Sequence, residues 1–380
     1  MRLGEVVQFV DRRVGNATAT VLSVSESLGI VRQDALFNKR IALKDLTKYR
    51  LVREGDIVYN PFLLWNRAVG GCFITDGGCV SPAYVVLSPR LSGTTRFVHY
   101  LMRSTAFGEL INGMASGTVT RRRTVPVADV LNLDLDIPPL GEQQAISEVL
   151  EAIDDKIESN RQICYNIDGL LSAEVVHAIS SDLDARTCTF GDLVERISVG
   201  VNPALLEDSV PYVGLEHIPR GSMILDDWGD SKGLGSGKAQ FIENDILFGK
   251  LRPYLKKVGV APISGICSTD VLVLRPISGT PLPVALAIAA SDPLIDYASA
   301  ASTGTRMPRV SWEYLAAFQT EVPGPDKMQD LGDRLRPLLE LAMDFVAQNR
   351  NLVAIRDALL PALLSGRIRV PAVAELVESK

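Results

Sequence analysis

The sequence has 380 residues, of which 47% are hydrophobic and 22% are charged, and its formal net charge is −6. This length and balance exclude a disordered chain and allow two domains, each with its own core. No run of about 18 apolar residues predicts a membrane span, and the N-terminus lacks the apolar core of a signal peptide. Five cysteines without a CxxC pair predict a reduced, cytoplasmic protein without a zinc site.

Charge is distributed unevenly along the chain. Residues 1–137 carry 17 basic and 12 acidic side chains, whereas residues 138–186 carry 3 and 10. The negative total argues weakly against a nucleic-acid partner, but binding depends on the field at one face rather than on the total charge. The segregation therefore predicts different partners for different parts of the chain.

Residues 1–137 have the pattern of short strands and loops with a few helices. Apolar alternations such as DIVYN and AYVVLS are separated by Gly, Pro, Asn and Ser, which is typical of strands joined by turns. The pair Pro138-Pro139 follows this segment. We therefore expect a first α+β domain over 1–137, with a small mixed sheet and helices.

A long helical segment is predicted over about 141–181. Its apolar residues alternate between spacings of four and three, and this repeat of about 3.5 is typical of a coiled-coil seam. We assign residues 138–186 to a first helical spacer. The seam consists of Ile146, Leu150, Ile153, Ile157, Asn160, Cys164, Ile167 and Leu171.

The second half of the chain repeats the first. Asp56-Ile57-Val58-Tyr59 matches Asp245-Ile246-Leu247-Phe248 at an offset of 189, and Ile137-Pro138 matches Val322-Pro323 at an offset of 185. A collinear series of such matches indicates a tandem duplication rather than an array of short repeats. We expect a second α+β domain over 187–323 and a second helical spacer over 324–380. Pro337 should kink or restart the helix of that spacer.

The second seam is predicted to include Met328, Leu331, Leu335, Leu338, Ala342, Phe345, Asn349, Leu352, Arg356, Leu359 and Leu363. Asn160 and Asn349 interrupt the two seams at matching places. One interpretation is an exposed polar residue on a fraying helix. The other is a buried polar pair that fixes the register between the helices. The predicted architecture is two tandem domains separated by an antiparallel two-helix coiled coil, related by a pseudo-two-fold axis.

The sequence lacks motifs for catalysis. GLGSGKA at 233–239 lacks the first Gly and the final Ser or Thr of a Walker loop, and no HExxH, GxSxG or GxGxxG occurs. The three histidines, His99, His177 and His217, lie far apart and are predicted to be structural. We expect no catalytic residue, metal or cofactor in this chain.

Basic and polar side chains gather in several predicted loops. Such residues neutralise phosphates and read base edges in the DNA grooves, although any one cluster is equally compatible with a solvated loop. Their occurrence at corresponding places in both halves favours DNA. The predicted DNA contacts are Trp65, Asn66, Arg67, Thr118, Thr120, Arg121, Arg122, Arg123, Lys238, Lys250, Arg252, Lys256, Lys257, Thr305, Arg306 and Arg309.

The sequence resembles the specificity subunits of Type I restriction–modification systems, which act in phage defence. The resemblance covers essentially the whole chain, but VPGPDKMQ at 322–329 departs from the IPPLGEQQ that opens the first helix. It is carried by IPPLGEQQAISEVLEAIDDKIESNRQ at 137–162, DILFGKLRPYLKK at 245–257, CSTDVLVLRP at 267–276 and LLPALLSGRIRV at 359–370.

The resemblance implies that each domain is a target recognition domain reading one half of a bipartite, asymmetric site on double-stranded DNA, with the coiled coil setting the gap. It implies a non-catalytic subunit that docks two methyltransferase subunits and two motor-nuclease subunits. Those partners, and not this chain, would bind S-adenosylmethionine and ATP. A cytoplasmic location away from membranes is expected.

Three alternatives stay open at this point. The chain could be the DNA-binding specificity scaffold of another phage-defence system, an enzyme whose site carries no recognised motif, or a protein–protein adaptor. The lack of an acid, base and nucleophile constellation speaks against the enzyme. Salt-sensitive DNA binding would exclude the adaptor.

Overall fold

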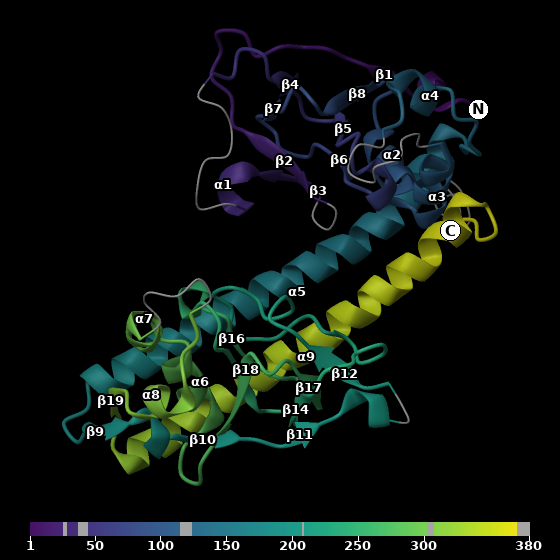
Figure 1. Cartoon of the computed structure of the whole chain (residues 1–380). Helices are drawn as coiled ribbons and strands as arrows, with labels where there is room; N and C mark the ends of the chain where they lie inside the picture. The colour runs from purple at the N-terminus through teal and green to yellow at the C-terminus, as the bar shows by residue number, and fades with distance from the viewer. Residues whose placement is uncertain (26–28, 37–44, 115–123, 207–208, 302–307, 371–380) are drawn as a thin grey trace, which may run out of the picture. The chain divides into compact units, whose positions relative to one another are not determined.

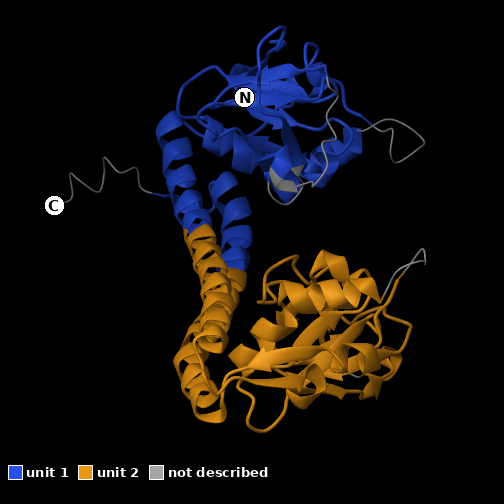
Figure 2. Ribbon diagram, turned by 90° about the vertical axis from the view of Figure 1, so that its left-hand side faces the viewer, with its two compact units in different colours: residues 1–155, 352–380 blue, residues 156–351 orange. Residues whose placement is uncertain are grey.

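The computed structural model describes residues 1–25, 29–36, 45–114, 124–206, 209–301 and 308–370 (Figure 1). The chain forms two compact units, one made of residues 1–155 with 352–380 and the other of residues 156–351 (Figure 2). The predicted domain boundaries at 137, 186 and 323 stay predictions. None of the helices in the described part of the chain is both long and apolar enough to cross a membrane.

The first unit is built on a four-stranded antiparallel sheet. Its order is β1 (Val7–Phe9), β8 (Val85–Pro89), β5 (Ile57–Tyr59) and β6 (Val69–Gly71). Helix α2 (Thr95–Arg103) packs against β6 and β5, and α3 (Thr105–Met114) packs against α2 and the 3-10 helix η2 (Leu64–Asn66). The core side chains Ile57, Leu87 and Phe97 are fully buried between these elements.

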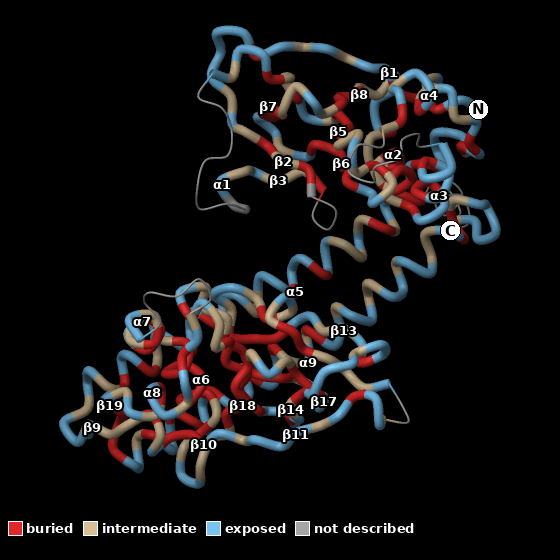
Figure 3. The backbone as a smooth tube through the Cα atoms, in the orientation of Figure 1, coloured by how far each residue is buried: buried red, intermediate tan, exposed pale blue. Residues whose placement is uncertain are grey.

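The second unit repeats this sheet with the same register. Its order is β10 (Val194–Ile197), β18 (Val271–Pro276), β15 (Ile246–Gly249) and β16 (Val258–Val260). Ile57 pairs with Gly71 and Leu87 in the first unit, and Ile246 pairs with Val260 and Leu274 in the second. The offsets of 187 and 189 therefore hold residue by residue across the hydrogen-bonded ladders. In Figure 3 buried residues run along these central strands and along the helices α2 and α6 (Leu282–Ala289).

A second set of strands also repeats. In the first unit β4 (Arg50–Val52) pairs with β7 (Gly78–Val80), and in the second β14 (Lys238–Phe241) pairs with β17 (Gly265–Cys267). A Cβ on Gly78 would lie 2.6 Å from the Thr20 carbonyl oxygen, and one on Gly265 would lie 2.4 Å from that of Pro211. Both strands therefore need glycine at the same place, because a neighbouring backbone approaches closely.

The second unit is a mixed sheet protein, as predicted. β17 also pairs in parallel with β12 (Pro211–Val213), which continues the order β11-β14-β17-β12-β13. The remaining strands are β2 (Leu22–Ser25), β3 (Gly29–Arg32), β9 (Arg186–Thr189), β11 (Gly200–Val201), β13 (Gly229–Asp230) and β19 (Gln319–Val322). The remaining helices are α1 (Gln33–Leu36), α4 (Val127–Leu131), α6 (Leu282–Ala289), α7 (Asp292–Ala300) and α8 (Trp312–Ala316), with the 3-10 turns η1 (Leu3–Glu5), η4 (Phe190–Asp192), η5 (Pro203–Leu205) and η6 (Pro253–Leu255).

Two long helices, α5 (Leu140–Ser180) and α9 (Pro325–Leu364), run antiparallel. In the second unit Cys164 Sγ lies 3.5 Å from the Ala342 carbonyl, and Arg334 pairs with Glu174 at 3.5 Å. Rising numbers on α5 thus meet falling numbers on α9, as Figures 1 and 2 also show. The predicted antiparallel helix pair is confirmed.

The sequence prediction for α9 was wrong about part of its seam. The helix is continuous from 325 to 364, so Pro337 does not restart it, and a kink at Pro337 stays a prediction. Leu339 and Val346 are buried, whereas Leu338 and Phe345 keep part of their surface exposed. The buried face drifts because α9 packs against the domain sheet and helices as well as against α5, and a helix in that setting follows its natural period of about 3.6 rather than a strict 3.5 repeat.

Candidate nucleic-acid interface

The turn between β5 and β6 presents three of the predicted DNA contacts. Its 3-10 helix η2 carries Trp65 and Asn66, and Arg67 caps its C-terminal end with φ of 63°. The Arg67 N–H donates to the Leu64 carbonyl at 2.9 Å, and the Asn60 N–H donates to the Ala68 carbonyl at 3.0 Å. These two hydrogen bonds close the turn. They leave Asn66 and Arg67 exposed and Trp65 half-buried against the core.

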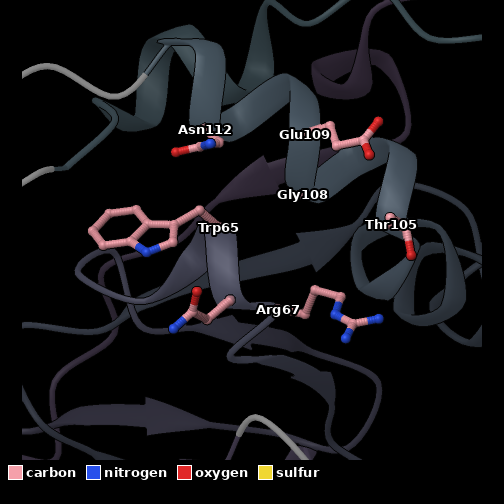
Figure 4. A pocket seen from close by; sticks show the side chains of 7 residues that line it. Trp65, Arg67, Thr105, Gly108, Glu109 and Asn112 are labelled. Carbon is pink, nitrogen blue, oxygen red and sulfur yellow. The ribbon is translucent and has the colours of Figure 1, made fainter. Parts of the chain in front are cut away.

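The turn and helix α3 enclose an open cavity of about 540 Å³ (Figure 4). Trp65 and Asn112 lie toward one end of it, and Arg67 and Thr105 lie toward the other. An aromatic face, a guanidinium and an amide are side chains that stack on bases, bind phosphates or hydrogen-bond to base edges. The lining consists of Trp65, Asn66, Arg67, Thr105, Gly108, Glu109 and Asn112.

Arg67 lies close to a second arginine, Arg103. The neighbouring Arg103 guanidinium donates to the Val69 carbonyl at 3.0 Å. Burial, followed by the charges of Arg356 and Arg67, holds the pKa of Arg103 below its usual range. Arg67 makes no ion pair with any residue that the structure describes. An anion placed against this turn would therefore meet an Arg67 guanidinium without an ion-pair partner, in a cavity whose lining also holds the Glu109 carboxylate.

Three α3 side chains of this cavity, those of Thr105, Glu109 and Asn112, were not among the predicted contacts, and neither was Gly108 on the same helix. They lie on one face of α3 and reach the turn only because α3 packs against η2. Their spacing of four and three residues was a signal of a common helix face, but nothing in the sequence placed that face beside Trp65.

In the second unit the predicted basic residues occur around the corresponding turn, and several have partners within the protein. Lys256 Nζ lies 2.7 Å from Asp292 Oδ1. Lys257 Nζ donates to the carbonyls of Leu215 and Ile218, the latter at 3.0 Å. Burial, followed by the charge of Arg220, lowers the pKa of Lys257.

Arg309 and Lys238 also have internal partners. The Arg309 guanidinium donates to both carboxylate oxygens of Asp270, at 2.7 and 3.3 Å. Lys238 is buried, and its ammonium donates to the carbonyl and hydroxyl of Ser236 at 2.6 and 2.7 Å. Among the predicted contacts that the structure describes, Lys238 has the most buried cation, and its hydrogen bonds hold the 236–238 turn.

The remaining predicted contacts divide into two groups. Lys250 is half-buried and Arg252 is exposed, with a left-handed backbone at φ of 54°. The others lie outside the described residues: Thr118, Thr120, Arg121, Arg122, Arg123, Thr305 and Arg306. A DNA contact by any of these residues stays a prediction.

Asn160 and Asn349 meet where the two helices pack in the second unit. The Asn160 amide donates to Asn349 Oδ1 at 2.9 Å and to Gln348 Oε1 at 2.6 Å. The Asn349 amide donates to the Ile157 carbonyl at 3.3 Å. Asn160 is completely buried and Asn349 half-buried, so the interpretation as a pair of exposed residues on fraying helices does not describe them.

Two comparisons with known proteins bear on this fold, and no protein-family model matches the chain. A stretch of 137 residues is 26% identical to the Type I restriction enzyme EcoDI specificity subunit of Escherichia coli. This stretch is 36% of the chain, and it spans 30% of the length of that relative. The crystal structure of the Type I restriction–modification S subunit from M. genitalium superposes with a TM-score of 0.56 at 14% identity. The superposition covers 96% of this chain and 95% of that one.

The chain has the fold of a Type I specificity subunit. The HsdS subunit from Thermoanaerobacter tengcongensis is 15% identical, but its TM-score of 0.35 is too low to add to the argument. The resemblance to Type I specificity subunits, inferred from the helix entry at 137–162 and from the repeated phrases, is therefore confirmed. So is the predicted α+β fold with two copies of one module and a long helical pair.

Proposed function

We propose that this chain is the DNA sequence-specificity subunit of a Type I restriction–modification complex. Each α+β domain reads one half of a bipartite, asymmetric site on double-stranded DNA. The observation that carries the proposal is the repetition of one sheet, with one register, in two units whose surface loops differ in sequence. Two readers with the same frame and different loops suit a site whose halves differ.

The helical pair has two tasks in this proposal. It sets the length of the unread gap between the two half-sites, and it docks two methyltransferase subunits. The acidic side chains Glu148, Asp155 and Glu158 are exposed on α5, and Glu151 is half-buried beside Arg96 at 2.6 Å. A row of carboxylates repels DNA phosphates and attracts a basic protein surface.

Catalysis belongs to the partners in this proposal. The methyltransferase subunits bind S-adenosylmethionine, and two motor-nuclease subunits bind ATP. The described residues hold no group of three or more His, Cys, Asp or Glu side chains arranged to bind a metal ion. The chain contributes recognition and assembly, so the complex and not the chain alone is the unit to assay.

A map of modified adenines tests the proposal. The chain is co-expressed with the methyltransferase encoded beside it, in a host without adenine methylation. We expect one gapped, asymmetric motif modified on both strands. Exchanging residues 187–323 for the matching domain of another specificity subunit should change one half of the motif and leave the other.

Two results would contradict the proposal. A contiguous motif would exclude two separated readers, and a domain exchange that altered both halves would exclude independent reading. Modification that is lost when the chain is omitted is the control that assigns specificity to it. Reversing the charges of Glu148, Glu151, Asp155 and Glu158 to Lys should weaken assembly with the methyltransferase, and unchanged assembly would remove α5 as the docking surface.

A further inference from the structure

The turn that carries Trp65 and Arg67 in the first unit has a structural counterpart in the second. At the offset of 189 that relates β5 to β15 and β6 to β16, Trp65 corresponds to Tyr254 and Arg67 to Lys256. Tyr254 lies in the 3-10 helix η6, and Lys256 caps the C-terminal end of η6 as Arg67 caps η2. Each turn thus presents an aromatic residue followed two positions later by a cation.

The backbone hydrogen bonds of the two turns also correspond. The Lys256 N–H donates to the Pro253 carbonyl at 2.8 Å, and the Gly249 N–H donates to the Lys257 carbonyl at 2.8 Å. These match the bonds from Arg67 to Leu64 and from Asn60 to Ala68 in the first unit. Each turn packs on the equivalent helix, η2 on α3 and η6 on α7. The two turns are therefore one structure built twice.

Both cations occupy a backbone conformation that disfavours them. Arg67 has φ of 63° and Lys256 has φ of 49°. This left-handed region is strained for residues with a Cβ and is normally occupied by Gly or Asn. The same molecule shows the ordinary solution at another pair of equivalent turns, before β5 and β15, where Gly55 has φ of 84° and Asn244 has φ of 72°.

Comparing Arg67 and Lys256 with Gly55 and Asn244 distinguishes a requirement for the backbone shape of the turn from a requirement for a positive charge. If the turn after η2 and η6 needed only its shape, Gly or Asn would serve there as they do at 55 and 244. A cation stands there in both copies instead, although the flanking residues differ, with Asn66 in one and Leu255 in the other. Strain that persists in a conserved geometry is characteristic of a functional site.

We propose that Arg67 and Lys256 are equivalent phosphate contacts, one in each unit, and that the aromatic side chain two residues earlier lies against the same stretch of DNA. This inference rests on the proposed function, since it names the part of each domain that meets the duplex. Tyr254 is 60% exposed and Trp65 lines the open cavity beside Arg67, so both rings have a face or edge available to a ligand. The phosphate contact fixes the position of each domain on the DNA, and neighbouring side chains read the bases.

The test replaces each cation with the residue that the backbone prefers. Arg67→Gly and Lys256→Gly remove the charge and relieve the left-handed strain, and Asn244→Gly makes the same backbone change where no cation is present. The full chain, assembled with its methyltransferase, is titrated against a fluorescent duplex of random sequence at several salt concentrations. Thermal unfolding of each variant is measured in parallel.

We expect Arg67→Gly and Lys256→Gly each to lower the slope of log affinity against log salt by about one unit, because one phosphate contact is lost. Their melting temperatures should be unchanged or raised. Arg67→Lys and Lys256→Arg should keep the slope of the wild type, and so should Asn244→Gly. Opposite effects on stability and binding cannot come from a damaged fold.

Two outcomes overturn the inference. One is an unchanged slope in both glycine variants while the wild-type complex binds DNA, which would leave the proposed function standing. The other is a loss of folding in Arg67→Gly or Lys256→Gly, together with a salt slope below that of the wild type in Arg67→Lys and Lys256→Arg. That result would make the two cations structural. A wild-type complex that fails to bind any duplex would instead refute the proposed function itself.

Discussion

The side-chain amide of Asn160 on α5 donates a hydrogen bond to Asn349 on α9, 189 residues away, at 2.9 Å. The two residues occupy the same position in the repeated helical phrase, so the duplication brings a residue into contact with its own copy. Because the helices run antiparallel, only one level of the seam can bring matching positions together, and Asn160 and Asn349 occupy that level. A polar pair inside an apolar seam disfavours shifted alignments, because any shift would bury an amide without its partner.

Asn349→Leu should destabilise the second unit more than Asn160→Leu does. Asn160 is completely buried and would keep only Gln348 as a partner, whereas Asn349 is half-buried and can turn to water. The loss for Asn349→Leu should be about 1–3 kcal/mol in the free energy of unfolding. Chemical denaturation of the two variants measures this difference, and equal losses would show that the pair does not act as described.

The double variant Asn160→Leu/Asn349→Leu separates stability from register. Its free energy of unfolding should be at least that of the wild type, because two leucines pack well in a seam. It should also populate more than one species in analytical ultracentrifugation, because the polar constraint on alignment is gone. A single sharp species would assign the register to the flanking apolar contacts instead.

The helical pair and the duplication could be predicted from the sequence because each leaves a regular pattern there. The helices show a regular spacing of apolar residues, and the duplication shows matches at a nearly constant offset. Matches at offsets of 185 to 189 became matching strand registers, and the predicted seam residues Ile146, Leu150 and Ile157 are buried. The seam of α9 was misplaced at Leu338 and Phe345 because its burial depends on a sheet that no local pattern places beside it. The register of a helix pair follows from the spacing of residues along each helix. The face that a helix buries against a domain depends instead on the tertiary fold.

The candidate site was predictable only as separate clusters of basic, polar and aromatic residues. Arg67 and Lys256 were predicted as members of different clusters. Their equivalence depends on φ angles and turn hydrogen bonds, which the composition of the loops does not reveal. Lys238 follows a glycine-rich run typical of an exposed loop, yet it is buried at the start of β14, which lies between β11 and β17, and its ammonium donates to Ser236. Long side chains next to turns can fold back onto carbonyls, and local sequence does not distinguish that from exposure.

Tyr100, Asp154 and Arg356 form a network in the first unit between α2 and the two long helices. The Tyr100 hydroxyl donates to Asp154 at 2.8 Å and the Arg356 guanidinium donates to the other carboxylate oxygen at 2.7 Å. Burial, and then the charge of Asp154, raises the pKa of Tyr100, so the phenol stays protonated and remains a donor.

Breaking this network should loosen the docking of α2 on the helices. Tyr100→Phe removes one hydrogen bond and should cost about 1 kcal/mol, whereas Arg356→Met leaves the half-buried carboxylate without its cation and should cost about 1.5–3 kcal/mol. Asp154→Asn combined with Arg356→Met should cost less than the two single changes added together. Additive losses in this double-mutant cycle would show that Asp154 and Arg356 act independently.

His99 should make the first unit sensitive to mild acid. Its Nδ1 accepts a hydrogen bond from the Gly71 N–H at 2.9 Å, which requires a neutral ring. Burial, followed by the charge of Arg103, lowers the pKa of His99 from 6.5 to about 3. The His99 ring is therefore protonated below about pH 6.5 in the unfolded chain, but only below about pH 3 in the folded chain.

The sign follows from this difference in bound protons. Stability from His99 is fully present above pH 6.5 and is lost as the pH falls from 6.5 toward 3. Between pH 7 and pH 5 the loss should reach up to about 2 kcal/mol, less to the extent that water still reaches the ring. His99→Gln should unfold earlier at pH 7 but show a shallower dependence over this window, and His177→Gln is the exposed control. An equal pH slope in wild type and His99→Gln would contradict the assignment.

Asp292 should hold the side chain of Lys256 in an ion pair when DNA is absent. Its carboxylate holds Lys256 at 2.7 Å, whereas the matching position in the first unit, at an offset of 187, is Thr105, which carries no charge. A phosphate that approaches Lys256 must therefore displace or tolerate a carboxylate. Because Asp292 is 80% exposed, the ion pair itself contributes little to folding.

Asp292→Asn should raise the affinity of the assembled complex for DNA a few-fold at low salt, with a melting temperature close to that of the wild type, since it removes a negative charge from the contact. Thr105→Asp should place a carboxylate beside Arg67 and lower affinity by a similar factor. The gain from Asp292→Asn should vanish in the background of Lys256→Gly. A gain that persists there would assign the effect of Asp292 to general repulsion of DNA rather than to its hold on Lys256.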